Sequence, residues 1–267
     1  MKKSWFTIAL LVIMFIVVYL GFVALAVQGR EGYGWKPPFG VYANINPTDD
    51  RDYGIYLMSS FTSPETIRQI AKKHKVGLIL YQETHPWPQT HYIDIALTQF
   101  SNVVSFVTIF EENSGALIPE LNATYDYIKD KYPGTKVYQW PHTNQLDFNR
   151  LGELKADGFI INPRWHWSEK TERPGGGVGG FESTYLYPAL ATGKPIINLL
   201  YLGLEADSPD LHPNYIWQYA IGQYQASAKH HVPVAVYEPF VPGFEALVKE
   251  RIKILEDSLK KSDKQMD

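Results

Sequence analysis

The segment from Asp157 to Phe181, DGFIINPRWHWSEKTERPGGGVGGF, contains one complete structural unit of the chain. Residues 158–162 are predicted to form a strand buried on both faces, which ends at Pro163. Four residues able to contact a ligand follow, namely Arg164, Trp165, His166 and Trp167, and then a loop with five glycines. A helix is predicted to begin near Phe181. A buried strand, a polar loop and a helix in this order make one β/α unit.

The same unit recurs along the chain at intervals of roughly 25–35 residues. Strands are predicted at 39–45, 53–59, 76–82, 103–110, 136–140, 158–162, 195–202 and 232–237, and helices at 63–74, 92–99, 117–132, 148–155, 182–192, 215–230 and 244–259. Strands that are apolar throughout belong in a parallel sheet covered by helices. We therefore predict an α/β fold over residues 39–262, a (β/α)8 TIM-type barrel with seven or eight parallel strands. The alternative is an open doubly wound sheet, but its usual GxGxxG motif and the P-loop are both missing.

An apolar segment without charged residues extends from Trp5 to Val27. About 23 helical residues span roughly 35 Å, enough to cross a hydrocarbon core of about 30 Å. Two lysines precede the segment, so the positive-inside rule predicts a cytoplasmic N-terminus and an extracytoplasmic domain. We predict a single-pass transmembrane signal anchor at 1–28 and a Gly/Pro-rich linker at 29–38. The alternative is a signal peptide cleaved near Ala24-Leu25-Ala26, which would make the domain secreted.

The composition excludes some classes of protein. The net charge of −3 gives no electrostatic basis for binding nucleic acid. The chain has no cysteine, so it has no disulfides. Its histidines lack a ligand spacing such as HExxH, and we predict neither a metal nor a cofactor. The composition does not identify a protein partner.

The charged residues 263–267 are predicted to form a disordered tail.

Polar and aromatic residues follow the predicted strands. In a barrel of parallel strands the carboxyl ends meet around one mouth, where the chemistry of such folds takes place. Three strands are followed by glutamates, at Glu83, Glu112 and Glu238. The other candidates for substrate binding are aromatic, amide, imidazole and guanidinium side chains: Trp140, His142, Asn162, Arg164, Trp165, Asn198 and Tyr201. Paired carboxylates, flat apolar rings and hydrogen-bond donors together suit the cleavage of a sugar chain.

This layout resembles that of the glycoside-hydrolase barrels, in which glutamates at separate strand ends act as acid/base and nucleophile. The resemblance extends over the soluble domain and is one of layout, without a family motif. It implies a hydrolase that cleaves a polysaccharide or a cell-surface glycan with two carboxylates. We expect Glu112 to be the proton donor and Glu238 the nucleophile or base, with Glu83 as the third candidate. The sequence departs from the family's Asn-Glu pair, because Phe110 precedes Glu111.

Two other functions fit the same residues. One is a non-catalytic barrel, with the same anchor, that binds a cell-surface glycan or a partner in an envelope assembly. The other is a hydrolase of phosphorylated substrates. It would use Arg164 and the glycine loop before Phe181, because bare backbone N–H groups at a helix start bind phosphate. For the glycoside hydrolase and for the non-catalytic binding protein, the expected partners are carbohydrate and the membrane.

Overall fold

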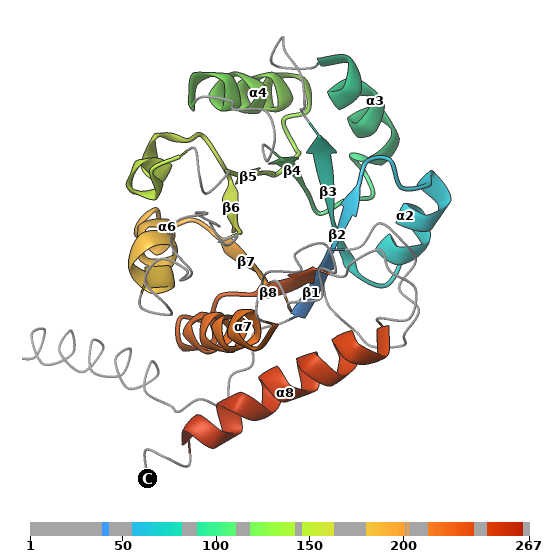
Figure 1. The fold of residues 1–267 in the computed structure, drawn as a ribbon. Helices are drawn as coiled ribbons and strands as arrows, with labels where there is room; N and C mark the ends of the chain where they lie inside the picture. The colour runs from blue at the N-terminus through green and yellow to red at the C-terminus, as the bar shows by residue number, and fades with distance from the viewer. Residues whose placement is uncertain are drawn as a thin grey trace, which may run out of the picture.

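The chain folds into a parallel β/α barrel. The computed structural model describes residues 39–42, 55–81, 90–110, 118–141, 146–162, 180–200, 202, 213–237 and 245–263. Strands β2 to β8 pair in chain order, and β1 pairs with both β2 and β8, which closes the ring (Figure 1). The strands are β1 (Phe39–Tyr42), β2 (Ile55–Ser59), β3 (Lys75–Tyr81), β4 (Phe106–Phe110), β5 (Val137–Trp140), β6 (Gly158–Ile161), β7 (Ile196–Leu200) and β8 (Val234–Tyr237). The closed ring of parallel strands confirms the predicted α/β barrel, and the alternative open sheet is not formed.

Helices and helical turns cover the outside of the ring. They are α2 (Pro64–Ala71), α3 (Thr90–Phe100), α4 (Ile118–Lys131), the 3-10 turn η1 (Phe148–Glu153), the π-helical turn η2 (Glu182–Leu186), α6 (Tyr187–Ala191), α7 (Pro213–Lys229) and α8 (Glu245–Asp263). The single helix predicted at 182–192 is therefore two pieces. The N–H of Tyr187 donates to the carbonyl of Glu182, and Pro188 follows with no N–H to donate. The proline interrupts the α-helical ladder, and a wider π-turn is formed before it.

The predicted transmembrane anchor at 1–28 and the linker at 29–38 lie outside the described residues. Within the described part of the chain, no helix is both long and apolar enough to cross a membrane. The membrane anchor therefore stays a prediction from the sequence.

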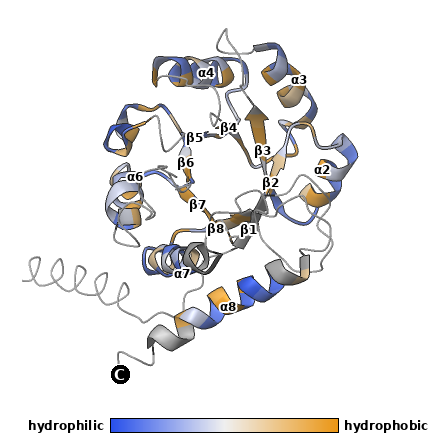
Figure 2. Ribbon diagram, in the orientation of Figure 1, coloured by the Kyte–Doolittle hydropathy of each residue, from blue (hydrophilic) through white to orange (hydrophobic). Residues whose placement is uncertain are grey.

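Two apolar cores lie on the two faces of the barrel sheet. The outer core lies between strands and helices, and includes alternate strand residues such as Val76, Val107 and Phe159. The inner core fills the barrel and consists of Leu57, Ile79, Phe106, Trp140, Ile160, Ile197, Leu199 and Ala235. Figure 2 shows the consequence, because the strands are largely hydrophobic whereas the helices mix hydrophilic and hydrophobic residues. Strands buried on both faces explain the unbroken apolar runs in the sequence.

Two aromatic rings and two glycines determine the packing near the amino-terminal ends of the strands. The rings of Phe106 and Tyr138 stack with centroids 4.4 Å apart and planes 22° from parallel. A Cβ added at Gly77 would lie 2.3 Å from the ring of Phe106, and one at Gly158 would lie 2.6 Å from the ring of Tyr138. Each ring therefore occupies the space that a side chain on the neighbouring strand would need.

Asp157 joins three elements just before β6. Its carboxylate accepts hydrogen bonds from the N–H of Val137 at 2.9 Å, the hydroxyl of Tyr125 at 3.1 Å and the ammonium group of Lys129 at 3.1 Å. Burial alone would raise the pKa of this carboxyl. The three donors outweigh burial and hold the pKa of Asp157 below its ordinary value. The ionised carboxylate thus ties α4 to the start of β5 and to β6.

Replacing Gly77 by alanine should destabilise the barrel, because a Cβ at residue 77 would lie 2.3 Å from the Phe106 ring and 2.9 Å from the Leu57 side chain, so both must shift. We expect a loss of about 1–3 kcal/mol in the free energy of unfolding, measured by urea titration. Gly134→Ala is the matched control, since nothing lies within 4 Å of a Cβ placed there. Equal unfolding midpoints for the two variants would show that the ring contact does not limit residue 77.

Removing the charge of Asp157 should make the free energy of unfolding less dependent on pH in the acidic range. Its lowered folded-state pKa means that its contribution is present above the unfolded-state value and disappears as the pH falls through the folded-state value. Asp157→Asn should therefore cost about 1–2 kcal/mol near neutral pH, with partial exposure limiting the effect, and almost nothing below about pH 2. Thermal unfolding between these pH values tests this, with Asp130→Asn on the exposed side of α4 as control. A deficit that stayed constant with pH would contradict the assignment.

Candidate functional site

The mouth at the carboxyl ends of the strands is the candidate functional site. Side chains alternate along each strand, so the residue two positions beyond an inner-core residue also faces inward. Ser59, Thr108 and Asn162 lie two positions beyond the inner-core residues Leu57, Phe106 and Ile160, and the inner-core residue Trp140 ends β5. All four are buried. Together they form the described floor of the mouth.

Trp140 closes the inner core from the mouth side. It is the last residue of β5, packs in the inner core and is only 3% exposed. A ring covered to this extent fills space and does not offer a whole face to a sugar. The predicted role of Trp140 as an aromatic platform is therefore reduced to that of the apolar floor beneath the mouth.

Two buried polar atoms on the inward side have no hydrogen-bond partner among the described residues. They are Oγ1 of Thr108 in β4 and Oδ1 of Asn162 just after β6. A buried polar atom without a partner costs free energy unless water or a ligand satisfies it. Asn162, a predicted substrate-binding residue, has a buried acceptor without a partner among the described residues, and its role in binding stays a prediction. Thr108 was not predicted, because a threonine inside an apolar strand gives no signal of a site.

Asn198 does not belong to the mouth, and this prediction is wrong. It is the third residue of β7, and its neighbours Ile197 and Leu199 face inward. Its Nδ2 donates to the hydroxyl of Ser227 in α7 at 3.0 Å, where both residues are fully buried. Strand alternation therefore turns Asn198 toward the helix layer, where it fixes α7 to the sheet.

Seven predicted site residues lie outside the described part of the chain: Glu83, Glu112, Glu238, His142, Arg164, Trp165 and Tyr201. Glu112 comes two residues after the last residue of β4, and Glu238 comes directly after the last residue of β8. Among the described residues, no three His, Cys, Asp or Glu side chains gather into a metal-binding group.

Phe61 is an aromatic residue at the same end of the barrel that sequence reasoning missed. It follows β2, and its side chain is 77% exposed. The hydroxyl of Ser59 accepts a hydrogen bond from the N–H of Phe61 at 3.1 Å, which shapes the turn that carries the ring. The signal available in the sequence was an aromatic residue between turn-forming residues in SSFTSP. An exposed ring here can face a ligand at the mouth.

The buried pair of Asn198 and Ser227 predicts a specific pattern of stabilities. Ser227→Ala leaves the Nδ2 group of Asn198 buried without its partner and should cost about 1–3 kcal/mol in unfolding free energy. Adding Asn198→Leu removes the amide that has lost its partner, so the double variant should be more stable than Ser227→Ala alone. Chemical denaturation of the two single variants and the double variant measures the coupling. Strictly additive losses would show that the two side chains do not interact.

No protein-family model matches the sequence, and no curated protein matches it either. Solved structures share its general fold at low similarity. Dihydropteroate synthase from Yersinia pestis is 8% identical with a TM-score of 0.48, over 86% of this chain and 93% of that one. A broad-specificity endoglucanase from an uncultured bacterium is 7% identical with a TM-score of 0.45, over 78% and 80%. Phosphoribosyl anthranilate isomerase from Thermococcus kodakaraensis is 12% identical with a TM-score of 0.40, over 75% and 88%. At these identities and TM-scores the likenesses identify no activity for this chain.

Proposed function

We propose that the chain is a membrane-anchored, extracytoplasmic glycoside hydrolase that cleaves a polysaccharide or cell-surface glycan at the carboxyl-terminal mouth of its barrel. The observation that carries the proposal is the closed ring of parallel strands. Such a ring directs every strand of the chain toward one mouth. The three glutamates that follow β3, β4 and β8 in the sequence are therefore candidates for a single site.

The order of strands favours Glu112 and Glu238 as the catalytic pair. Strands β4 and β8 are four positions apart in a ring of eight, so they lie across the barrel from one another. Chain connectivity limits Glu112 to about 7 Å from the end of β4, and Glu238 to about 4 Å from the end of β8, measured between Cα atoms. Two carboxylates approaching from opposite sides can flank a glycosidic bond, as this hydrolysis requires.

The proposed roles follow from the chemistry of glycoside cleavage. Glu112 protonates the leaving oxygen, and Glu238 acts as nucleophile or as the base that activates water. Carboxyl groups about 5 Å apart retain the anomeric configuration, whereas a separation of about 6.5–9.5 Å inverts it. Glu83 follows β3, the neighbour of β4, and is the substitute for Glu112 in this scheme.

The remaining predicted residues supply binding. Asn162 offers a buried acceptor to a sugar hydroxyl from the floor of the mouth. Phe61 offers an exposed ring at the same end of the barrel. His142, Arg164, Trp165 and Tyr201 follow β5, β6 and β7 in the sequence and complete the proposed set of donors and aromatic faces. A site with these parts binds a neutral, polyhydroxylated substrate.

Charge removal at the two glutamates tests the proposal. Glu112→Gln and Glu238→Gln should each lower kcat on a cleaved glycan by about a hundredfold to ten-thousandfold, because each loses a proton-transfer or nucleophilic step. Glu250→Gln, on the exposed side of α8, is the matched control and should keep full activity. Reducing-end release from a panel of polysaccharides measures the rates, and circular dichroism checks the fold.

The pattern of results also separates the alternatives. Cleavage retained in both glutamine variants would reject the pair. Glycan binding without any cleavage by the unmodified chain would favour the non-catalytic binding function, which the buried acceptor of Asn162 serves equally well.

A further inference from the structure

The amino-terminal pole of the barrel, opposite the mouth, has an excess of positive charge. Six described loops lead from the helical layer into β3 to β8 and form this pole. Their charged residues, together with the first residue of β3, are Lys72, Lys73, Lys75, Lys136, Lys155, Lys194 and Asp157. These residues therefore comprise six lysines and one acid, although the whole chain has a net charge of −3.

The one acid and two of the lysines are already paired. Asp157 is bound by Lys129 at 3.1 Å, and Lys155 is bound to Asp126 at 2.7 Å. The Nζ of Lys194 donates to the carbonyl of Leu154 at 3.2 Å and lies over the ring of Phe159. These groups are committed to the fold.

Four lysines of the pole are exposed and have no ion-pair partner in the described part of the chain: Lys72, Lys73, Lys75 and Lys136. These four lysines are accessible to solvent. Their charge is available to attract an anionic surface, at a range of about 8–10 Å at physiological ionic strength.

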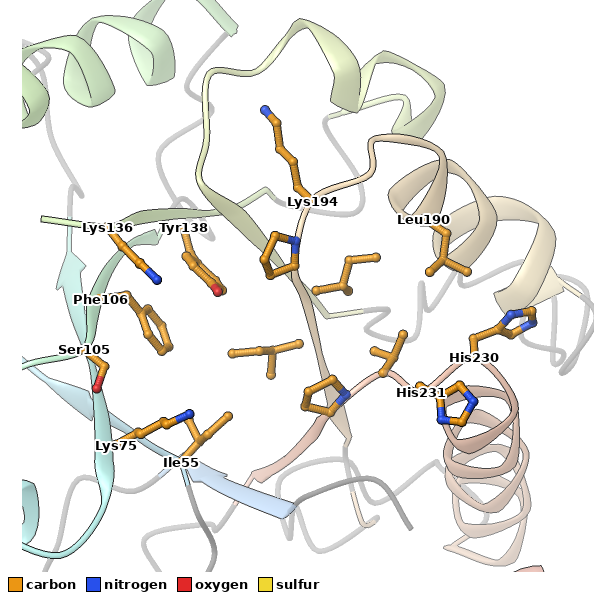
Figure 3. A pocket seen from close by; sticks show the side chains of 15 residues that line it. Ile55, Lys75, Ser105, Phe106, Lys136, Tyr138, Leu190, Lys194, His230 and His231 are labelled. Carbon is orange, nitrogen blue, oxygen red and sulfur yellow. The ribbon is translucent and has the colours of Figure 1, made fainter. Parts of the chain in front are cut away.

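A cavity of about 730 Å³ lies at the centre of this pole. Its wall includes the apolar side chains of Ile55, Phe106 and Ile197, together with Tyr138. Figure 3 shows the side chains of Lys75 and Lys136 directed toward the cavity, and Lys194 directed away from it. Ammonium groups around a partly apolar hollow match the headgroup region of a lipid bilayer, where charge and hydrocarbon meet.

The predicted anchor precedes the strand that enters the barrel at this pole. Strand β1 is parallel to its neighbours, so Phe39, its first residue, lies at the amino-terminal pole. Ten residues, 29–38, separate β1 from the predicted anchor at 1–28. Ten residues reach at most about 35 Å when fully extended. The linker therefore allows the pole to reach a bilayer that holds the anchor.

We infer that the amino-terminal pole docks on an anionic phospholipid bilayer, with Lys75 and Lys136 contacting headgroup phosphates, while the mouth of the barrel faces away from the membrane. This inference rests on the proposed membrane anchoring and adds the orientation of the domain. Lysines near an anionic surface each strengthen binding about fivefold, and the short linker keeps the pole at a high local concentration. The mouth then remains open to a large glycan.

Site-specific fluorescence on the full-length chain tests the orientation. The chain has no cysteine, so single cysteines can be labelled cleanly. Ser105→Cys puts an NBD label at the pole cavity, and Phe61→Cys puts one at the mouth. The proteins are reconstituted into phosphatidylcholine vesicles with or without one third phosphatidylglycerol, and headgroup spin labels quench the NBD. We expect at least twofold stronger quenching at 105 than at 61 in the anionic vesicles, and a smaller difference in neutral vesicles or high salt.

Charge variants identify the groups responsible. Lys75→Gln with Lys136→Gln should reduce the quenching at 105, whereas Lys249→Gln with Lys253→Gln on α8 removes the same charge and should not. Equal quenching at 105 and 61, or no response to the pole variants, would overturn the docking. Resistance of vesicle association to alkaline carbonate tests the anchoring separately. Loss of association with all vesicles would reject both anchoring and docking, whereas anchored protein with equal quenching rejects docking alone. Neither result depends on Glu112 or Glu238.

Discussion

Burial of strands β2 to β8 on both faces is the constraint on which the rest of the structure depends. A closed parallel sheet has no solvent-facing side, because the inner core fills one face and the helices cover the other. A polar side chain within a strand must then form hydrogen bonds, because a buried polar group without a partner lowers the stability of the fold. The side-chain amide of Gln139 shows both cases, since its Nε2 donates to the carbonyls of Leu121 and Lys155 in the outer layer, whereas its buried Oε1 has no partner among the described residues. Polar chemistry is consequently confined to the two ends of the barrel.

This constraint explains why the fold was predictable from sequence. Strands such as VGLILYQ and PIINLLYL are apolar at every position, and a single polar face would have broken that pattern. The helix beginning after Ser63 was equally clear, because the Ser63 hydroxyl accepts from the N–H of Thr66 and Pro64 occupies the first turn. The π-turn before Pro188 was not predicted, since helical periodicity does not report how backbone donors are shared.

The site was less predictable, because it depends on the direction of each side chain. Asn162 and Asn198 look alike in sequence, as both follow isoleucines in an apolar run. Their positions differ by one step of alternation, so Asn162 faces the mouth and Asn198 faces α7. Sequence alone does not determine which strand residues face inward, and an error of one residue moves every side chain of the strand to the opposite face. Thr108 was missed because a threonine inside an apolar strand gives no signal of a site.

The charge at the amino-terminal pole has two separable origins. All helices of a β/α barrel run against the strands, so their C-terminal ends meet at this pole and favour cations there. Lys129 and Lys229 in the last turns of α4 and α7, and Glu65 and Glu120 in the first turns of α2 and α4, follow this rule. Lys75 and Lys136 do not, because they lie at the starts of β3 and β5, beyond the helix ends, and line the cavity. The helix dipole does not account for their position, whereas the proposed docking on an anionic bilayer would give these two lysines a role.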